Sequence, residues 1–192
     1  MKISIITINY NNKEGLLNTI KSIQKQTSNI YEYIVVDGNS VDGSVCVIKK
    51  YNDLITKWVS EDDTGIYNAM NKGVKLASGE YCLFLNAGDV LYSSKTIQNL
   101  NLQTFTYDFI LGGVVSPQVG HIKAKPNLKL SDFYFGSIPH QSSIIRRQML
   151  LDTPYDEKLR IVSDWKFALE RIIFDQTSYK AISEIIAIEE AG

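Results

Sequence analysis

The sequence predicts an α/β fold in which helices flank a mainly parallel central sheet. Short, almost wholly apolar runs alternate along the first half with segments whose apolar residues recur at helical spacing. Strands that are apolar on both faces are typical of a parallel sheet covered by helices. A polar loop follows each of these runs, and right-handed crossovers bring such loops to one edge of the sheet. The sequence therefore places a ligand site at that edge.

The first half predicts four strands with helices between them. The predicted strands are residues 3–8, 33–36, 55–59 and 81–85. Leu16, Ile20 and Ile23 mark a first helix by their spacing, and Asp42 opens a short helix over residues 45–49. A third helix carries an apolar stripe from Ile66 to Ala77. Thr64 is predicted to cap the start of this third helix, and Gly79 is predicted to end it.

The second half is less regular. Residues 109–115 predict a strand with residues 120–124 beside it, and residues 142–145 and 183–188 predict two more. An aromatic cluster spans residues 133–135. Ser163 is predicted to cap a helix that carries Trp165 and Ile172. No repeat or linker interrupts the pattern, so residues 1–192 are predicted to form a single domain.

The composition excludes several classes of protein. Among 192 residues, 44% are hydrophobic and 21% charged, which is typical of a soluble globular domain. A net charge of −1 gives no bulk attraction to nucleic acid. Cys46 and Cys82 are far apart and are predicted to be buried free thiols rather than zinc ligands. Without a signal peptide or a long apolar run, the chain is predicted to be cytoplasmic, which is compatible with peripheral contact at the inner face of a membrane.

Two common nucleotide-binding motifs are missing from the sequence. It contains no G-x-x-x-x-G-K-[ST] and no G-x-G-x-x-G after the first strand. A P-loop ATPase and an NAD-dependent dehydrogenase are therefore excluded as predictions. If a nucleotide binds, its phosphates need another positive charge, and a divalent cation held by a carboxylate supplies one.

The polar loops offer candidate ligands, each with a purely structural alternative. Asp37 ends the second strand and can accept the N3–H of uracil while Tyr10 stacks on the base, or it can simply start an Asp-Gly turn. After Asp63 and Gly65, the side chains of residues 68, 71 and 72 share one helix face, which either contacts a nucleotide-sugar or is only solvated.

Several motifs in order resemble the family 2 glycosyltransferases of the GT-A fold. They are residues 7–12 (TINYNN), 36–43 (VDGNSVDG), 65–73 (GIYNAMNKG), 77–81 (ASGEY), 85–89 (LNAGD), 139–141 (PHQ) and 163–165 (SDW). The resemblance implies a Rossmann-like GT-A domain, with residues 1–90 as the nucleotide-sugar half and residues 91–192 as a smaller acceptor half. Relatives usually continue past Ala191 and Gly192, so it also implies a truncated or naturally short chain.

The resemblance implies an inverting enzyme that moves a sugar from a nucleoside diphosphate, here UDP, to a hydroxyl of a glycan or lipid-linked acceptor, in bacterial surface polysaccharide synthesis. The family's Asp-x-Asp metal motif falls on Asn86 and Gly88, so Asp89 is predicted to hold Mn²⁺ or Mg²⁺. The family's general base matches Asp164, which would also suit the start of a helix for purely electrostatic reasons. Together with the loop residues, the predicted nucleotide-binding set is Thr7, Asn9, Tyr10, Asp37, Asp63, Gly65, Asn71, Lys72 and Asn86.

Four further residues are assigned to the acceptor or phosphate side. They are His140, Gln141, Arg146 and Trp165. His140 alternatively satisfies a loop carbonyl, Arg146 alternatively faces solvent, and Trp165 alternatively belongs to the core. Two rival functions remain at this point: a nucleotidyltransferase, and a non-catalytic module that binds nucleotide-sugars.

Overall fold

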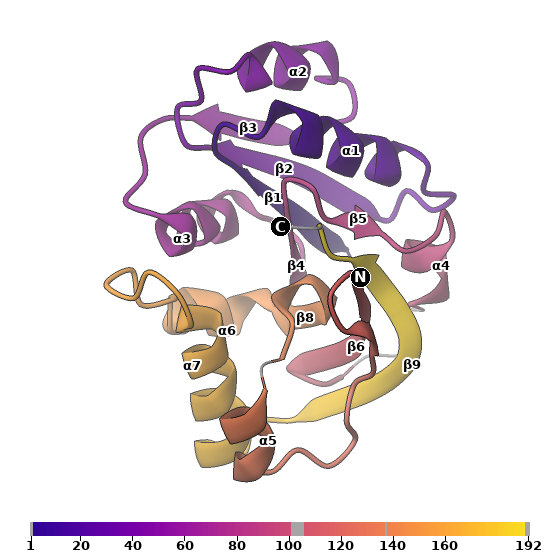
Figure 1. Cartoon of the computed structure of the whole chain (residues 1–192), viewed down its shortest axis with the longest axis vertical. Coiled ribbons are helices and arrows are strands. Elements are labelled where there is room, and N and C mark those ends of the chain that lie inside the picture. The colour runs from indigo at the N-terminus through magenta and orange to yellow at the C-terminus, as the bar shows by residue number, and fades with distance from the viewer. Residues whose placement is uncertain (1, 101–105, 137, 191–192) are drawn as a thin grey trace.

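A computed structural model describes residues 2–100, 106–136 and 138–190 and shows a nine-stranded sheet flanked by helices (Figure 1). Ala191 and Gly192 lie outside these residues. The strands are β1 Ile3–Asn9, β2 Tyr31–Asp37, β3 Lys57–Ser60, β4 Tyr81–Asn86, β5 Val90–Leu91, β6 Phe109–Ser116, β7 Gly120–Ile122, β8 Ser143–Arg146 and β9 Tyr179–Ile188. The helices are α1 Lys13–Gln24, α2 Ser44–Lys50, α3 Ile66–Leu76, α4 Thr96–Asn99, α5 Leu130–Phe135, α6 Arg147–Asp152 and α7 Ser163–Leu169, with the 3₁₀-helix η2 His140–Ser142 and the π-helical turn η3 Glu170–Phe174.

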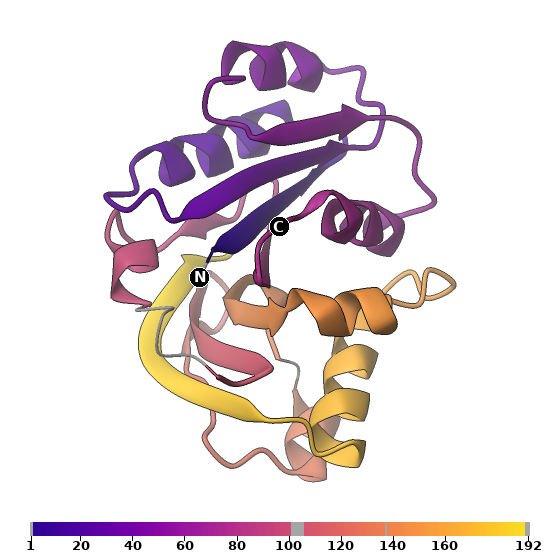
Figure 2. The same ribbon diagram turned by 180° about the vertical axis from the view of Figure 1, so that it is seen from behind.

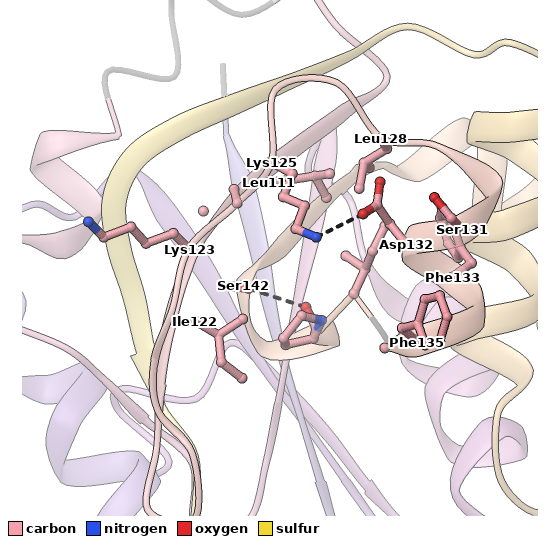
Figure 3. Close-up of a pocket in the computed structure, with 15 residues that line it drawn as sticks. Leu111, Ile122, Lys123, Lys125, Leu128, Ser131, Asp132, Phe133, Phe135 and Ser142 are labelled. Carbon is pink, nitrogen blue, oxygen red and sulfur yellow. Dashed lines mark hydrogen bonds and ion pairs between the residues drawn. The ribbon is translucent and has the colours of Figure 1, made fainter.

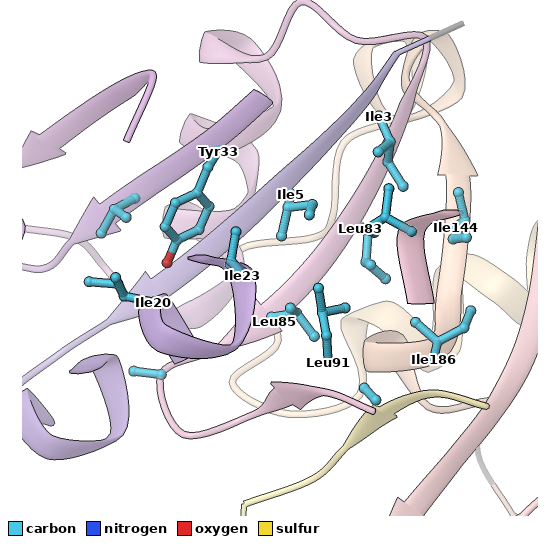
Figure 4. Close-up of a cluster of buried hydrophobic side chains, with 14 of the residues drawn as sticks. Ile3, Ile5, Ile20, Ile23, Tyr33, Leu83, Leu85, Leu91, Ile144 and Ile186 are labelled. Carbon is cyan, nitrogen blue, oxygen red and sulfur yellow. The ribbon is translucent and has the colours of Figure 1, made fainter. Parts of the chain in front are cut away.

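The first half forms the predicted parallel sheet. The strands lie in the order β3-β2-β1-β4, and each pairs in parallel with its neighbour. Alternate residues of β1 point to opposite faces, so Ile3 and Ile5 join one core and Ile6 and Ile8 the other. The first core lies beneath α1 (Figure 4), and the second lies beneath α3. Burial on both faces explains why these strands read as continuous apolar runs.

The second half continues the same sheet with mixed strand directions. β8 pairs antiparallel with β4, β6 pairs antiparallel with β8, and β9 runs parallel to β6. The long strand β9 curves around this half and brings its end to β5, with which it pairs antiparallel (Figure 2). The edge to which β1 and β4 point thus receives the end of the last strand as well.

The start of α3 differs from the prediction. Gly65, with φ of +131°, occupies the N-cap position, and Thr64 makes no side-chain cap. The Asp63 carboxylate instead accepts the Gly65 N–H at 2.9 Å. At the other end the helix stops at Leu76. The predicted helix-ending Gly79 lies against β1, where its N–H donates to Ser4 and leaves no room for a side chain.

The start of α7 also corrects a prediction. Ser163 is the first residue of the helix, and the N-cap position belongs to Val162, which adopts a left-handed φ of +74°. The Ser163 hydroxyl is buried without a hydrogen-bond partner among the described residues. Left-handed backbone is strained for a β-branched residue, and such strain tends to occur at functional sites.

Other elements were not predicted at all. They are β5, α4 and α6, and residues 130–135 form the helix α5 where only an aromatic cluster was foreseen. Both cysteines are free thiols as predicted, but Cys46 is exposed because it lies on the outer side of α2. Among the described residues, no helix has the length and apolar character needed to cross a bilayer.

Candidate active site

The carboxyl ends of the four parallel strands bring polar residues together at one edge of the sheet. In the strand register, Asn9 lies opposite Asp37, and Asp37 lies opposite Ser60. Asn86 ends β4 on the other side of β1, opposite Ile8. These four residues come from widely separated parts of the sequence, and the crossovers place them in a row, as predicted for this class of sheet.

Asp37 lies at the centre of a buried network. Its carboxylate accepts the Asn9 Nδ2–H at 2.6 Å, the Ser60 hydroxyl at 2.6 Å and the Ser40 backbone N–H at 3.0 Å. The side chain is fully buried, so in this arrangement it orients the loops after β1, β2 and β3. Its predicted contact with a nucleobase stays a prediction.

Two amide oxygens at this edge have no partner. Asn9 Oδ1 and Asn86 Oδ1 are buried without a hydrogen bond to any described residue. Buried polar atoms are nearly always paired. Two unpaired acceptors at the ends of neighbouring strands therefore indicate a place where a bound molecule completes the hydrogen bonding.

Two residues of the predicted nucleotide-binding set, Tyr10 and Asp63, lie next to each other over Gly38. The Tyr10 ring is 68% exposed. A Cβ atom at Gly38 would lie 3.1 Å from the Tyr10 ring and 2.5 Å from Asp63 Oδ2, so both side chains approach the same stretch of backbone. Gly65 is exposed close by, bonded to Asp63. An exposed ring beside a partly exposed carboxylate suits a planar base with a hydrogen-bond donor.

Three residues of the predicted nucleotide-binding set have structural contacts instead. Thr7 is buried and accepts the hydroxyl of Tyr33 inside the core under α1. Asn71 is buried and bonds both backbone groups of Tyr155, tying α3 to the segment before α7. Lys72 pairs with Glu61 at 2.9 Å and donates to the Asp62 carbonyl. Their direct contact with a nucleotide stays a prediction.

The loop after β4 directs its carboxylate into the protein. Asp89 is 2% exposed, and its two oxygens accept the backbone N–H groups of Asn86 and Glu190, each at 3.0 Å. Burial raises the pKa of Asp89 above its ordinary value, although these hydrogen bonds and the nearby His140 oppose the shift. Asp89 therefore shapes this turn, and its ligation of a metal stays a prediction.

A second carboxylate stands over this loop, and sequence reasoning missed it. A Cβ atom at Gly88 would lie 2.1 Å from the carboxyl carbon of Glu190, so the Glu190 side chain fills the space above the glycine. No group of three or more Asp, Glu, His or Cys side chains gathers into a metal site within the described ranges. One or two carboxylates with substrate phosphates are enough for Mg²⁺, and an exposed Glu190 fits such a cation.

A chain of hydrogen bonds links Asp164, the predicted general base, to Asn86 at the edge of the sheet. Tyr67 donates its hydroxyl to Asp164 Oδ1 at 2.7 Å, and His140 Nδ1 lies 3.1 Å from Asp164 Oδ2. The other ring nitrogen of His140 lies 3.0 Å from Asn86 Nδ2. Since an amide nitrogen only donates, Nε2 accepts this bond, which leaves the proton on Nδ1, directed to Asp164. The sequence did not point to Tyr67 as part of this chain of hydrogen bonds, because its spacing from the apolar residues of α3 is that of a core residue.

These contacts determine the protonation of Asp164. Burial by itself would raise its pKa, but the hydrogen bonds that the carboxylate accepts from His140 and Tyr67 outweigh burial and lower the pKa below the ordinary value. Burial and the adjacent Asp164 raise the pKa of Tyr67, so the phenol stays a donor. Asp164 is therefore an ionised carboxylate at neutral pH, ready to accept a proton.

Asp164 and His140 face an open cavity of about 720 Å³. Trp165 lines it as well and donates its indole N–H to the Phe133 carbonyl at 3.0 Å. Its rim carries exposed apolar side chains, among them Tyr134 and Phe135, which are 83% and 85% exposed, and Ile161.

Gln141 and Arg146, the other two residues assigned to the acceptor or phosphate side, do not line this cavity. Gln141 is buried beside His140 in η2. Arg146 ends β8 opposite Tyr81, at the far end of β4 from Asn86, and pairs with Glu80 and Asp108. The structure does not bring Arg146 to the site.

A second cavity of about 390 Å³ lies beyond the segment that carries Phe135 (Figure 3). Apolar side chains such as Leu111, Ile122 and Leu128 line it, and the Lys125–Asp132 ion pair, 2.8 Å long, lies at its wall. Phe135 and Gly136 border both cavities, so this helix end separates the open cavity from an apolar one.

Comparison with known proteins gives one family. The family model for glycosyl transferase family 2 matches residues 4–160. The chain is 29% identical over 178 residues to Rv1514c, an uncharacterized glycosyltransferase of Mycobacterium tuberculosis strain H37Rv, covering 87% of this chain and 67% of that protein.

Solved structures show the same fold. TarS 1–349 of Staphylococcus aureus in complex with UDP matches with a TM-score of 0.82 at 19% identity, over 100% of this chain and 61% of that one. Mannosyltransferase PcManGT from Pyrobaculum calidifontis in complex with GDP-Man and Mn²⁺ matches with a TM-score of 0.76 at 17% identity, over 100% and 57%. These likenesses confirm the predicted α/β architecture, and the chain spans about three fifths of each solved chain.

Proposed function

Since the chain belongs to glycosyl transferase family 2 and is a glycosyltransferase, we propose that it moves a sugar from a UDP-sugar to an acceptor hydroxyl with inversion at the anomeric carbon. The UDP complex of TarS supports the choice of donor. The observation that carries the proposal is the hydrogen-bonded chain from Tyr67 through Asp164 and His140 to Asn86.

In the proposed reaction Asp164 is the general base. The acceptor hydroxyl attacks the anomeric carbon, its proton passes to Asp164, and the bond from that carbon to the diphosphate oxygen breaks. A carboxylate that takes this proton during attack accelerates such a step by about 10²–10⁴-fold. Tyr67 and His140 hold both oxygens of Asp164 and keep it ionised.

On the donor side, the nucleoside lies along the edge formed by Asn9, Asp37 and Tyr10. The unpaired Asn9 and Asn86 oxygens accept hydrogen bonds from the donor. A divalent cation on the diphosphate would neutralise the charge that develops on the leaving group. His140 touches both Asn86 and Asp164, so it stands where the donor and acceptor meet.

On the acceptor side, the rim of the 720 Å³ cavity supports a lipid-linked acceptor. Exposed Tyr134, Phe135 and Ile161 present apolar surface around Asp164, and Arg160 adds a positive charge to the same cavity. An acceptor sugar joined to a lipid through phosphate matches both features. We place this enzyme in the assembly of bacterial surface polysaccharides, with this rim against the membrane.

The test replaces Asp164 with asparagine. Asp164→Asn keeps the size and the hydrogen bond to Tyr67 but cannot take a proton, so transfer should fall by roughly 10²-fold or more, with UDP affinity within about threefold of the parent. Labelled sugar transfer from UDP-sugars to lipid and oligosaccharide acceptors, beside calorimetry with UDP, measures both. Asp156→Asn, which removes a carboxylate paired with Lys166, is the matched control and should keep full transfer.

Full transfer by Asp164→Asn would remove Asp164 as the base. A parent protein that binds UDP and transfers no sugar would favour a non-catalytic binding module over the enzyme.

A further inference from the structure

The loop after β4 has an unusual arrangement of carboxylates. Of residues 86–89, only Asp89 carries one, and both of its oxygens accept backbone N–H groups inside the protein. Gly88, the residue at the surface of this turn, contributes no side chain and has a φ of +111°, which other residues rarely adopt. The loop therefore offers no accessible carboxylate of its own to a ligand at this edge.

Glu190 fills the place of a side chain at Gly88. A Cβ atom there would lie 2.1 Å from Cδ of Glu190 and 2.2 and 2.5 Å from its two oxygens, far inside van der Waals contact. The glycine is thus what admits the glutamate. A carboxylate from the end of β9 stands directly on the β4 loop, at the sheet edge where ligands of parallel sheets bind.

Two contacts hold Glu190 in this place. Its backbone N–H donates to Asp89 Oδ1 at 3.0 Å, and its carboxylate accepts Asn12 Nδ2–H at 3.1 Å. Asn12 also donates to the Ala87 carbonyl at 3.1 Å, so it joins the glutamate to the loop itself. None of the ion pairs formed by the described residues includes Glu190, and its side chain is exposed. The carboxylate is oriented, charged and open to solvent.

We propose that Glu190 supplies the carboxylate that holds the divalent cation on the donor diphosphate, in place of a carboxylate within the β4 loop. This inference rests on the proposed function. Mg²⁺ and Mn²⁺ take oxygen ligands, and a site of one carboxylate completed by phosphate oxygens and water is a common arrangement. Asp89 then acts as a positioning residue, because it fixes the Glu190 backbone.

The test measures how Mn²⁺ affects UDP binding. Glu190→Gln keeps the side-chain length and an oxygen for Asn12 but removes the charge. UDP affinity in the presence of Mn²⁺ should fall at least about tenfold, and metal-free UDP affinity should stay within about twofold of the parent. The loss of one charge-assisted contact predicts this size. Calorimetry with UDP, with and without Mn²⁺, gives the affinities, and the electron paramagnetic resonance signal of Mn²⁺ gives the bound metal directly.

Glu189→Gln is the matched control, since it removes the neighbouring charge from the same strand end and should keep the Mn²⁺ effect. Glu190→Asp retains the charge and should recover part of the Mn²⁺ effect on UDP affinity. An equal Mn²⁺ effect in the parent and Glu190→Gln overturns the inference, as does an equal loss with and without Mn²⁺, which would mark a structural role. If the parent binds UDP with the same affinity with and without Mn²⁺, the inference about Glu190 is also overturned, while the glycosyltransferase proposal stands. Absence of UDP binding under every condition would instead refute the proposed donor.

Discussion

The Nδ1 atom of His140 lies 3.1 Å from Oδ2 of Asp164, and this contact joins the two halves of the candidate active site. His140 belongs to η2, directly before β8, and Asp164 belongs to the first turn of α7. The opposite side of the imidazole meets Asn86 at the end of β4. One imidazole ring thus orients the proposed base and contacts the sheet edge at Asn86.

The first prediction concerns His140 as a positioning residue. His140→Gln should lower kcat by about 10- to 100-fold, because one charge-assisted hydrogen bond to Asp164 is lost or misdirected. KM for an acceptor should change far less, since the residue orients the base. Steady-state kinetics at saturating donor measure the two constants. His121→Gln, on the exposed strand β7, is the control and should match the parent. A variant with raised KM and unchanged kcat would contradict this role.

The second prediction concerns the nucleobase. UDP should bind about tenfold more tightly than CDP or GDP, because a carboxylate beside Tyr10, from Asp37 or Asp63, accepts the N3–H that cytosine lacks, and a purine is larger. Tyr10→Ala should weaken UDP by about 1–3 kcal/mol through lost stacking. Calorimetry with UDP, CDP and GDP checks both. Tyr92→Ala, an exposed tyrosine of the β5 region, is the control. Tighter binding of GDP than of UDP would contradict the assignment of uracil as the preferred base.

The third prediction concerns the apolar rim. The double variant Phe135→Ser/Ile161→Ser should bind vesicles of equal parts phosphatidylcholine and phosphatidylglycerol at least about tenfold more weakly than the parent. Burying a large apolar side chain contributes about 1.5–3 kcal/mol, so two losses suffice. Co-sedimentation measures the binding. Val119→Ser removes a 70% exposed residue that does not line the cavity and should bind as the parent does. Equal vesicle binding by all three proteins would assign the rim to another partner.

The fourth prediction concerns acid stability. Burial would raise the pKa of Glu32, but hydrogen bonds from Ser4, Ser78 and Gly79 lower it to about 2. Because the pKa of Glu32 in the folded protein lies below its ordinary value of 4.5, the ionised carboxylate stabilises the fold above that value, and this stability is lost as pH falls from about 4.5 to 2. The shift corresponds to about 3 kcal/mol. Urea unfolding at several pH values should therefore show a shallower acid decline for Glu32→Gln.

Glu14→Gln, an exposed residue of the first turn of α1, is the control for that series and should keep the acid decline of the parent. An identical slope in Glu32→Gln and the parent would show that other groups cause the acid loss.

The fold of the first half was predictable because β1, β2 and β4 are buried on both faces and the helices between the strands are buried on one. Asn9, Asp37 and Asn86 were predictable as neighbours for the same reason, since the ends of parallel strands meet at one edge. Strand direction in the second half leaves no such mark on the sequence. β8 runs antiparallel to β4. The turn η2 before β8 therefore brings His140 to the site, and Arg146 at the end of β8 lies at the opposite edge.

Contacts between distant segments were the least predictable part of the site. Glu190 contacts Gly88 only because β9 crosses the whole second half, and no local pattern in the sequence predicts the course of this strand. Tyr67 resembles a core residue by spacing, yet its hydroxyl reaches Asp164 from the edge of that core. The left-handed Val162 was equally hidden, because β-branched residues normally avoid this conformation and composition gives no sign of it.

The position of β9 in the sheet has a consequence for biosynthesis. β9 pairs with β6 and β5, and both of these strands leave the ribosome long before residues 179–188 do. Until that last strand arrives, one edge of β6 stays open while the parallel half is already able to collapse. Unpaired edges of apolar strands invite association between nascent chains. The order of strands thus leaves this edge of β6 open to such association during the interval before β9 closes the sheet.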